Sequence, residues 1–473
     1  MAAVQEARVG DGSEVCDRGP RQELACRVLL FPLPFQGHIN PMLQLADVLY
    51  NRGLAVTILH TRFNALDPAL HPEFDFVTVP DGIPAEVAAA ASGNIIEIIL
   101  TMNEAMEATT AVDDVLASVI ADEARPRSAC LFIDGNLLAV QKAAAKLGLP
   151  TLVLRTGSAA CLGSFLAFPK LYEMGYLPRQ QSQLYMPVKE LPPLRVRDLF
   201  FSIHSSQEKV RKVLARITES VKGSSGVVIN TSEALEINEL ERIHSEDNVP
   251  MVLAAGPLHK LSSTSTGSSL LDQDYSCIKW LDTQPVRSVL YVCFGSLSSM
   301  NSNEFLEVAW GLANSSHHFL WVVRPGMING MNGLDFPDGF NVSVQGRGKV
   351  IQWASQQQVL GHPAVGAFWT HNGWNSTLES ISEGVPMLCR PQSSDQMMNA
   401  RYVEKIWGIG FELEGELERG RIEIAIRNLM CGREGVEMRK RAEELKIEVL
   451  DCLNTYGSSR IAIDKLVNYI LSL

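Results

Sequence analysis

The chain has 473 residues, of which 46% are hydrophobic and 20% are charged, and its formal net charge is −12. This composition supplies two hydrophobic cores and excludes a disordered chain, while the acidic surface disfavours nucleic acid as a partner. The nine cysteines are dispersed, and no apolar stretch reaches the ~18 residues that a membrane helix needs. We therefore expect free thiols, a cytoplasmic protein and no membrane insertion.

The first part of the chain alternates between expected strands and helices. Residues 1–25 are charged and lack an apolar segment, which predicts a leader outside the fold. A buried strand is expected at 27–31, followed by a helix with Asn40 as its N-cap and Pro41 at its first position. Further strands are expected at 55–59, 76–79, 129–133, 151–154 and 226–230. The alternation predicts a parallel, doubly wound sheet in a first domain, 26–256.

The alternation starts again after a predicted linker at 257–275, which contains a serine-rich tract. Strands are expected at 288–294, 319–323, 349–352, 367–370 and 386–389, with a helix at 303–312. This pattern predicts a second domain, 276–455, and an amphipathic helix at 456–473 that packs back across the domains. The expected fold class is α/β, with two Rossmann-like domains facing across a cleft that lies at the carboxyl ends of their strands.

A segment in the second half carries the pattern of an anion site. Thr370 to Thr377 reads THNGWNST, a glycine turn that follows one strand and opens a helix. Exposed amides at a helix N-terminus suit a diphosphate, although a capped helix with nothing bound has the same outline. His371, Asn375 and Ser376 add donors, and Glu379 lies one turn beyond Asn375, where it can accept from ribose hydroxyls. The crowding of these side chains favours a phosphate site.

The whole segment from Trp353 to Gln396, WASQQQVLGHPAVGAFWTHNGWNSTLESISEGVPMLCRPQSSDQ, resembles the signature box of plant family-1 UDP-sugar glycosyltransferases. The resemblance extends over FPLPFQGHINPMLQLA and SVLYVCFGS, and HTRFNA is typical of subfamily 76, whose members glucosylate cytokinins, benzoxazinoids and diterpenoids. It implies the GT-B fold and an inverting transfer of glucose from UDP-glucose to a small lipophilic acceptor. It also implies a monomer that needs neither a metal nor another cofactor.

The resemblance implies a role for each matching position. Trp353 is expected to stack on uracil, with the Ala354 backbone and Gln356 nearby, and Glu379 is expected to hold the ribose. The diphosphate is expected to contact His371, Asn375, Ser376 and Ser296. The sugar is expected to contact Trp374, Asp395, Gln396 and Thr156. Because a glutamine amide offers both a donor and an acceptor, Gln396 with Asp395 favours glucose over galactose as the sugar. Glucuronate is disfavoured because no obvious cation stands beside Trp374 and Asp395 to pair with its carboxylate.

His38 and Asp134 form a second candidate constellation. His38 lies in a glycine-flanked loop between a buried strand and a helix, and Asp134 directly follows the strand at 129–133. Both positions fall on the carboxyl edge of the first sheet, where a carboxylate can orient an imidazole and stabilise its protonated form. A lone histidine is more often structural, but the resembling family has this pair. We therefore expect His38 to be the catalytic base.

The sequence departs from the family pattern at two places. Ser355 stands where proline is usual, which should loosen a turn, and Ser393 and Ser394 replace an aromatic and a small residue beside the sugar.

Among the rival classes, a dehydrogenase would need G-x-G-x-x-G after a strand, which is absent. A metal-dependent transferase would need D-x-D at a strand end, and 272–274 is a chance match in the linker. A protein that only binds a nucleotide sugar would not need a catalytic base. The sequence indicates an apolar acceptor pocket but not which acceptor it binds.

Overall fold

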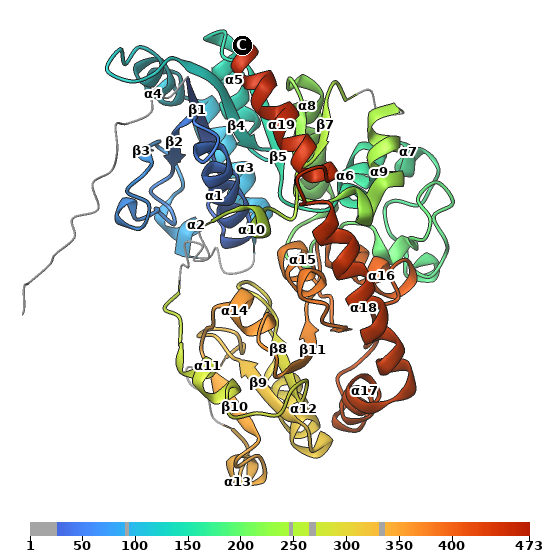
Figure 1. Ribbon diagram of the computed structural model, residues 1–473. Helices are drawn as coiled ribbons and strands as arrows, with labels where there is room; N and C mark the ends of the chain where they lie inside the picture. Colours follow the sequence, from blue (N-terminus) through green and yellow to red (C-terminus); the bar gives the residue numbers. More distant parts are fainter. Residues whose placement is uncertain (1–25, 90–93, 246–248, 264–270, 331–335) are drawn as a thin grey trace, which may run out of the picture.

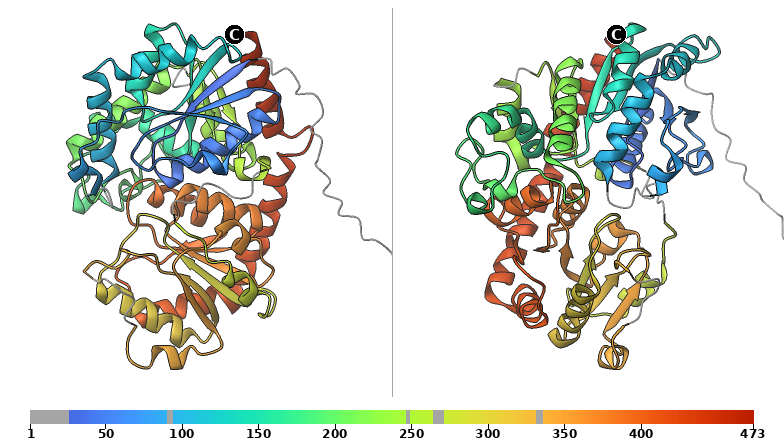
Figure 2. Two further views of the ribbon diagram at one scale, coloured as in Figure 1. Left: turned by 90° about the vertical axis from the view of Figure 1, so that its left-hand side faces the viewer. Right: turned by 180° about the vertical axis from the view of Figure 1, so that it is seen from behind.

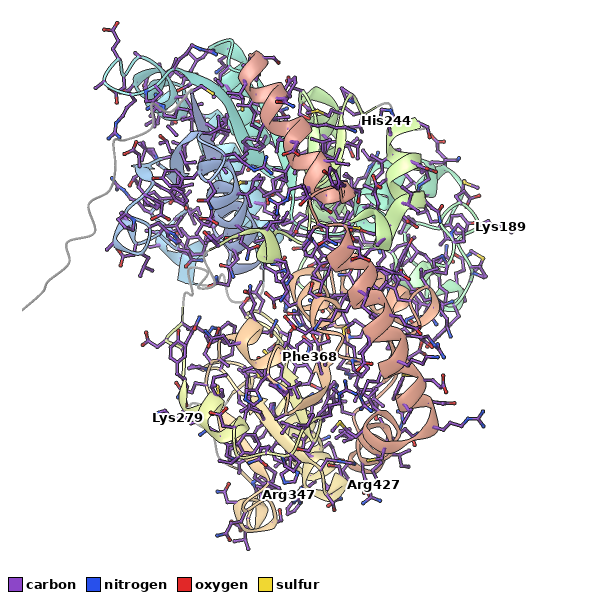
Figure 3. All side chains as sticks on the ribbon, viewed as in Figure 1. Lys189, His244, Lys279, Arg347, Phe368 and Arg427 are labelled. Carbon is purple, nitrogen blue, oxygen red and sulfur yellow. The ribbon has the colours of Figure 1, made fainter. Side chains whose placement is uncertain are left out.

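The protein consists of two lobes, each a parallel sheet covered by helices (Figure 1). The computed structural model describes residues 26–89, 94–245, 249–263, 271–330 and 336–473, and the predicted leader 1–25 lies outside them. Charged side chains such as Lys189, Lys279 and Arg427 lie on the outside of the lobes, whereas Phe368 is buried within the second (Figure 3).

The first sheet has the strand order β3-β2-β1-β4-β5-β6-β7, and each of its described pairs is parallel. Its strands are β1 (Arg27–Phe31), β2 (Ala55–His60), β3 (Asp75–Thr78), β4 (Ser128–Asp134), β5 (Thr151–Arg155), β6 (Val227–Ile229) and β7 (Val252–Ala254). The helices of this lobe are α1 (Gln36–Tyr50), α2 (Ala85–Ala89), α3 (Ile95–Glu107), α4 (Ala111–Ile120), α5 (Leu138–Lys146), α6 (Ala159–Leu166), α7 (Phe168–Glu173), α8 (Gln207–Gly223), α9 (Glu233–Ser245) and α10 (Leu258–Leu261).

The second sheet has the order β10-β9-β8-β11-β12-β13, again parallel in its described pairs. Its strands are β8 (Val289–Cys293), β9 (His318–Val322), β10 (Gly348–Ile351), β11 (Val365–Thr370), β12 (Met387–Cys389) and β13 (Gly410–Glu412). The remaining helices are α11 (Ser276–Leu281), α12 (Ser302–Ser315), α13 (Phe340–Ser343), α14 (Gln356–Leu360), α15 (Trp374–Glu383), α16 (Gln396–Lys405), α17 (Arg419–Cys431), α18 (Arg433–Asp451) and α19 (Ser458–Ser472).

The expected strands are confirmed to within two residues at their ends, because fully buried parallel strands read as continuous apolar runs. Two strands were not predicted, β7 and β13. Each has only three residues, and such a short run carries no distinct pattern. The eight cysteines among the described residues are all free thiols, as expected. In the described part of the chain, no helix is long and apolar enough to cross a membrane.

The start of α1 differs from the prediction. The helix begins at Gln36 rather than after Asn40, so Pro41 lies inside it. Asn40 does not cap the helix, because its side chain accepts a 2.6 Å hydrogen bond from Gln36 Nε2. A proline within a helix lacks the N–H that would bond the carbonyl four residues earlier, which here belongs to Gly37. That carbonyl therefore remains free for another donor.

The connections between the lobes also differ in detail from the prediction. Part of the expected linker is helical: α10 packs against α1, and the Ser263 amide donates to buried Asp47 at 2.6 Å. The serine-rich tract beyond it falls mainly on residues 264–270, outside the described residues. Near the C-terminus, α18 contacts α15 and α17 of the second lobe and α9 of the first. Helix α19 then packs on β4 and β7, along the edge of the first lobe (Figure 2).

Candidate active site

Sheet topology brings the expected site residues together from distant parts of the chain. In the first sheet the order reverses between β1 and β4, which pair with Phe31 opposite Ile133. In the second sheet it reverses between β8 and β11, where Cys293 lies opposite Thr370. Ligands of doubly wound sheets bind outside the carboxyl ends of strands at such points. The loops that follow these four strands all line one cavity of ≈ 390 Å³ between the lobes.

His38 and Asp134 form a hydrogen-bonded pair at the first of these points. His38 Nδ1 lies 2.7 Å from Asp134 Oδ2, and Thr156 Oγ1 lies 3.1 Å from the same ring nitrogen. His38 lines the cavity, whereas Asp134 is only 1% exposed and lies behind it. When Nδ1 donates to the carboxylate, Nε2 is left as the unprotonated nitrogen of the ring, the arrangement that a general base requires.

The surroundings of Asp134 stabilise its charged form. Its other oxygen, Oδ1, accepts from the Asn136 amide nitrogen at 3.0 Å and from Asn136 Nδ2 at 2.7 Å. Burial alone would raise the pKa of Asp134. The charge and hydrogen bond of His38, with Arg155 and the Asn136 amide, outweigh burial and lower that pKa. The carboxylate is therefore a fixed acceptor that determines how His38 is oriented.

Asn375 connects the two lobes beside His38. Its Nδ2 donates a 2.9 Å hydrogen bond to the Gly37 carbonyl, the group that Pro41 leaves free within α1. The resemblance assigned Asn375 to the diphosphate. The side-chain amide carries two hydrogens, so one donor remains after this contact, and Asn375 Oδ1 is buried with no hydrogen-bond partner in the described part of the chain.

His371 is positioned by two glycines at the second switch point. A Cβ atom added at Gly295, where φ is +76°, would lie 2.5 Å from His371 Nε2, and one added at Gly373 would lie 2.6 Å from it. Burial, with the nearby Arg324 cation, lowers the pKa of His371 to about 4, so the ring is neutral at pH 7. Its Nδ1 is buried and has no hydrogen-bond partner among the described residues. Arg324 fixes the neighbouring loop by donating to the Gly295 carbonyl at 3.2 Å and the Ser298 carbonyl at 2.6 Å.

The expected nucleoside end of the cavity is a hydrogen-bonded cluster. Gln356 Nε2 donates to Ser376 Oγ at 2.8 Å and to Glu379 Oε2 at 2.7 Å. Burial raises the pKa of Glu379, although bonds from Gln356 and Gln357 oppose that rise. Trp353 and Ala354 line the same end, and Ser296 lines the cavity near His371. Ser355, which replaces the usual proline, has φ −70°, the value that proline would fix, so the turn keeps its shape.

The loop expected to hold the sugar is only partly as predicted. Asp395 stands at the N-cap position of α16 without capping it, and its Oδ2 accepts from Asn399 Nδ2 at 3.1 Å. Burial raises the pKa of Asp395. The Gln396 expectation needs correction: its carbonyl oxygen accepts from the Gln392 amide at 2.9 Å and the Ser393 amide at 3.3 Å. Both lone pairs are thus used within its own turn, and only its NH₂ group is available to a ligand.

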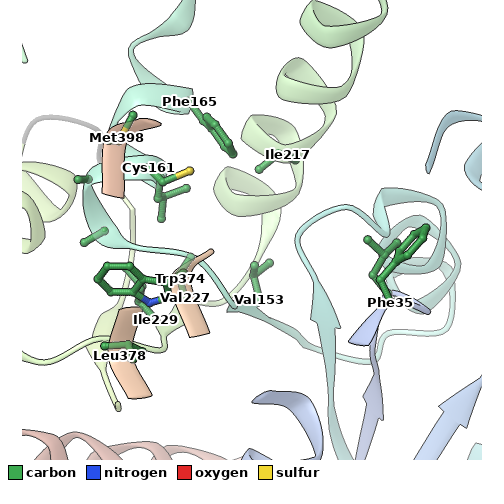
Figure 4. Close-up of a cluster of buried hydrophobic side chains, with 14 of the residues drawn as sticks. Phe35, Val153, Cys161, Phe165, Ile217, Val227, Ile229, Trp374, Leu378 and Met398 are labelled. Atoms are coloured by element: carbon green, nitrogen blue, oxygen red, sulfur yellow. The ribbon is translucent and has the colours of Figure 1, made fainter. Parts of the chain in front are cut away.

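Trp374 lies at the start of α15 and lines the cavity. The resemblance assigned this residue to the sugar hydroxyls, but it is 4% exposed and its indole Nε1 donates to the Asn230 carbonyl at 2.7 Å. An indole has one donor and no acceptor, so this contact uses the polar group of the ring, and a contact between the rest of the residue and the sugar stays a prediction. Figure 4 shows the ring buried beside Val227 and Ile229 of the first lobe. Its role is to anchor the start of α15 to that lobe.

Thirteen of the fourteen expected residues line the cavity, and Asp134 is the exception. Sequence reasoning missed three side chains that shape the site: Asn136, Arg324 and Arg155. Arg155 could have been noticed, because it stands at a strand end directly before Thr156, whereas Arg324 acts through backbone carbonyls and leaves no local signal. Among the described residues, no group of three His, Cys, Asp or Glu side chains is placed to hold a metal ion.

This fold and this cavity define a glycosyltransferase of the GT-B type, and known proteins agree. The model of the UDP-glucoronosyl and UDP-glucosyl transferase family matches residues 269–437. UDP-glycosyltransferase 76B1 of Arabidopsis thaliana is 42% identical over 446 residues, which are 94% of this chain and 98% of that protein. DIMBOA UDP-glucosyltransferase BX9 of Zea mays is 45% identical over 424 residues, covering 89% of this chain and 90% of that protein.

Solved structures agree on the fold. A UDP-glucosyltransferase from Polygonum tinctorium has a TM-score of 0.79 at 28% identity, covering 95% of this chain and 99% of that one. Phytolacca americana UGT2, in complex with UDP-2fluoro-glucose and pterostilbene, has a TM-score of 0.78 at 27% identity, covering 94% and 99%. The chain belongs to the plant family-1 UDP-glycosyltransferases, and its relatives include members of subfamily 76.

Proposed function

We propose that this protein is an inverting glucosyltransferase that moves glucose from UDP-glucose to a hydroxyl or amine of a small lipophilic plant metabolite and forms a β-glucoside. The observation that carries the proposal is the 2.7 Å contact between His38 and buried Asp134 at the wall of a cavity that both lobes line. A protein that only bound a nucleotide sugar would have no use for a base held in this way.

The proposed reaction is a single displacement at the anomeric carbon. His38 Nε2 takes the proton of the acceptor hydroxyl while the hydroxyl oxygen attacks the anomeric carbon. Asp134 stabilises the imidazolium that forms. The bond to UDP breaks as the new bond forms, so an α-linked donor gives a β-glucoside. The charge that develops on the diphosphate lies at the N-terminus of α15, where Ser376, the second Asn375 hydrogen and neutral His371 supply donors.

Two observations support a small, largely apolar acceptor. The cavity wall of the first lobe carries Ile99, Phe165, Phe200 and Ile217, and such walls recognise small apolar molecules. The Zea mays relative is described as acting on DIMBOA, and the Polygonum enzyme on indoxyl. Both support this class of acceptor.

Glucose is the proposed sugar because the loop beside it presents an acceptor and a donor of fixed direction. An ionised Asp395 can only accept hydrogen bonds, and the Gln396 NH₂ group can only donate them. Among the described residues that line the cavity, no Lys or Arg comes from the second lobe. A glucuronate carboxylate near Asp395 would therefore have to compete with that carboxylate for the one cation among the described lining residues, Arg155 of the first lobe.

The direct test replaces the base. His38→Ala should lower kcat by about 10²–10⁴, the usual contribution of a general base. Binding of UDP-glucose, measured by calorimetry, should change little because the donor side of the cavity is intact. If kcat remained near the wild-type value, His38 would not be the base and the proposal would fail.

A further inference from the structure

Arg155 is a buried cation that the proposed reaction does not use. It is the last residue of β5, it is 5% exposed, and it lines the cavity. Its guanidinium carbon lies 5.3 Å from the centre of the Phe165 ring, on the apolar wall of the first lobe. The next residue, Thr156, touches His38. The guanidinium is therefore a near neighbour of the catalytic base within the acceptor half of the cavity.

The charges that line the cavity are distributed unevenly. Among its described lining residues, Arg155 is the one Lys or Arg, and the carboxylates, Glu379 and Asp395, both come from the second lobe. The first lobe thus contributes a permanent positive charge and no carboxylate to the acceptor half. An isolated charge on an apolar wall is unfavourable unless something pairs with it.

No side chain of the described residues forms an ion pair with this guanidinium. Its Nε is buried without a hydrogen-bond partner, and the neighbouring Cys161 thiol is a weak acceptor. The head group packs against glycines: a Cβ at Gly135 would lie 3.5 Å from Nη1, and one at Gly157 would lie 3.7 Å from Nη2. The backbone at these glycines lies beside the head group, and a guanidinium presents a planar fork of donors whose geometry matches a carboxylate.

A purely electrostatic role is the main alternative. The charge of Arg155 adds to the effect of His38 in lowering the pKa of Asp134, and it opposes the rise that burial causes in the pKa of Asp395. However, Asp134 already accepts from His38 and twice from Asn136, and it does not line the cavity. A Cβ built on Gly157 would lie 3.7 Å from both Asp395 Oδ2 and Arg155 Nη2, yet these two groups form no ion pair. Neither carboxylate therefore occupies the donors of Arg155.

We propose that Arg155 forms an anion subsite in the acceptor half of the cavity, and that the enzyme takes hydroxycarboxylic acids as acceptors. The acceptor carboxylate receives hydrogen bonds from the guanidinium, its apolar body lies against Phe165 and Ile217, and its hydroxyl reaches His38. This inference rests on the proposed function, which supplies the transfer to that hydroxyl. It deepens the function by naming the acceptor class.

The test compares matched acceptors. The probes are 2-, 3- and 4-hydroxybenzoate and the three corresponding hydroxybenzamides, which have the same shape without the charge. With saturating UDP-glucose, wild-type kcat/KM should favour the carboxylate of the best-fitting pair by about 10- to 100-fold, as expected for a charge-assisted, two-pronged contact. Arg155→Gln should remove this preference by lowering the value for the benzoate and leaving that for the benzamide within about threefold.

Two further variants separate the subsite from a general effect of charge. Arg155→Lys keeps the charge but not the fork, so it should retain part of the preference. Arg211→Gln removes an equal charge from an exposed arginine that lies over Tyr172, outside the cavity, and should leave the preference unchanged. Circular dichroism checks folding. If Arg155→Gln does not fold, the comparison of benzoates with benzamides in wild type and in Arg155→Lys still tests the subsite.

Three results would overturn the inference. Wild-type enzyme could use the benzamides as well as the benzoates, or Arg155→Gln could lower both equally, which would assign Arg155 to holding Asp134 and Asp395. If no probe is glucosylated, calorimetry with UDP bound measures the same pairs. Tighter binding of the benzoates that disappears in Arg155→Gln would support the subsite while transfer to them fails, and equal binding would overturn it.

Discussion

Asp134→Asn should inactivate the enzyme through the tautomer of His38. Oδ1 of Asp134 accepts twice from Asn136, so an asparagine must turn its oxygen toward Asn136 and its NH₂ toward the imidazole. That NH₂ would donate to His38 Nδ1 across the present 2.7 Å contact. The ring proton would then reside on Nε2, which is the nitrogen that must accept the proton of the acceptor.

The expected loss is that of the whole base, about 10²–10⁴ in kcat, or roughly 3–5.5 kcal/mol in the barrier. Asp134→Ala leaves both tautomers of His38 accessible. In the productive tautomer the proton is on Nδ1, and Thr156 Oγ1, 3.1 Å away, can accept from it. The asparagine variant should therefore be at least as slow as the alanine variant, although it is the smaller change.

Initial rates at saturating UDP-glucose measure both variants, and calorimetry shows whether donor binding is intact. Asp47→Asn is the matched control, because Asp47 is a buried carboxylate on α1 that bonds Ser262 and Ser263 away from the cavity. Its kcat should stay within about threefold of wild type. An asparagine variant clearly faster than Asp134→Ala would refute the tautomer argument.

Three further predictions concern the donor side of the cavity. Gly295→Ala should raise the KM for UDP-glucose about tenfold, because the added Cβ would displace His371. Gly326→Ala is the control: it has a similar φ of +73° but nothing within 4 Å of the added Cβ, so its KM should stay near that of wild type. Equal KM values for the two variants would contradict the reasoning. His371 has a folded pKa of about 4, below its unfolded value, so the stability it contributes is complete above pH ~6.5 and is lost as the pH falls toward 4. Urea unfolding of wild type should therefore lose up to about 3 kcal/mol more over that range than His371→Asn, and parallel curves would count against it. In competition between equal UDP-glucose, UDP-galactose and UDP-glucuronate, glucose should be preferred over galactose by about tenfold, the effect of one misplaced hydroxyl; equal use of the two, or a preference for glucuronate, would remove Asp395 and Gln396 from sugar recognition.

The sequence determined the parts of the protein that are encoded locally. Mainly apolar runs of four to seven residues indicated the main strands, since a parallel strand buried on both faces has few polar positions. The glycine turn at 371–376 fixed the start of α15 and the direction of its amides. Because both sheets are doubly wound, residues at or just beyond the end of a strand must lie at the carboxyl edge, and this predicted that Asp134 at the end of β4, His371 after β11 and His38 in the segment that follows β1 lie there.

The tertiary structure decided what each of those side chains faces. Trp374 and Gln396 occupy the expected turns, yet the Asn230 carbonyl takes the indole donor and two backbone amides take the glutamine oxygen. Asn375 bonds Gly37, 338 positions away, only because Pro41 frees that carbonyl and the lobes dock there. Arg155 likewise stands at the end of a strand, and only the surrounding wall shows that it forms no ion pair with another described residue and that its Nε is buried without a described partner. A hydrogen bond is directional and uses up its donor and acceptor. The availability of a polar group therefore depends on partners distant in the chain, which no local pattern encodes.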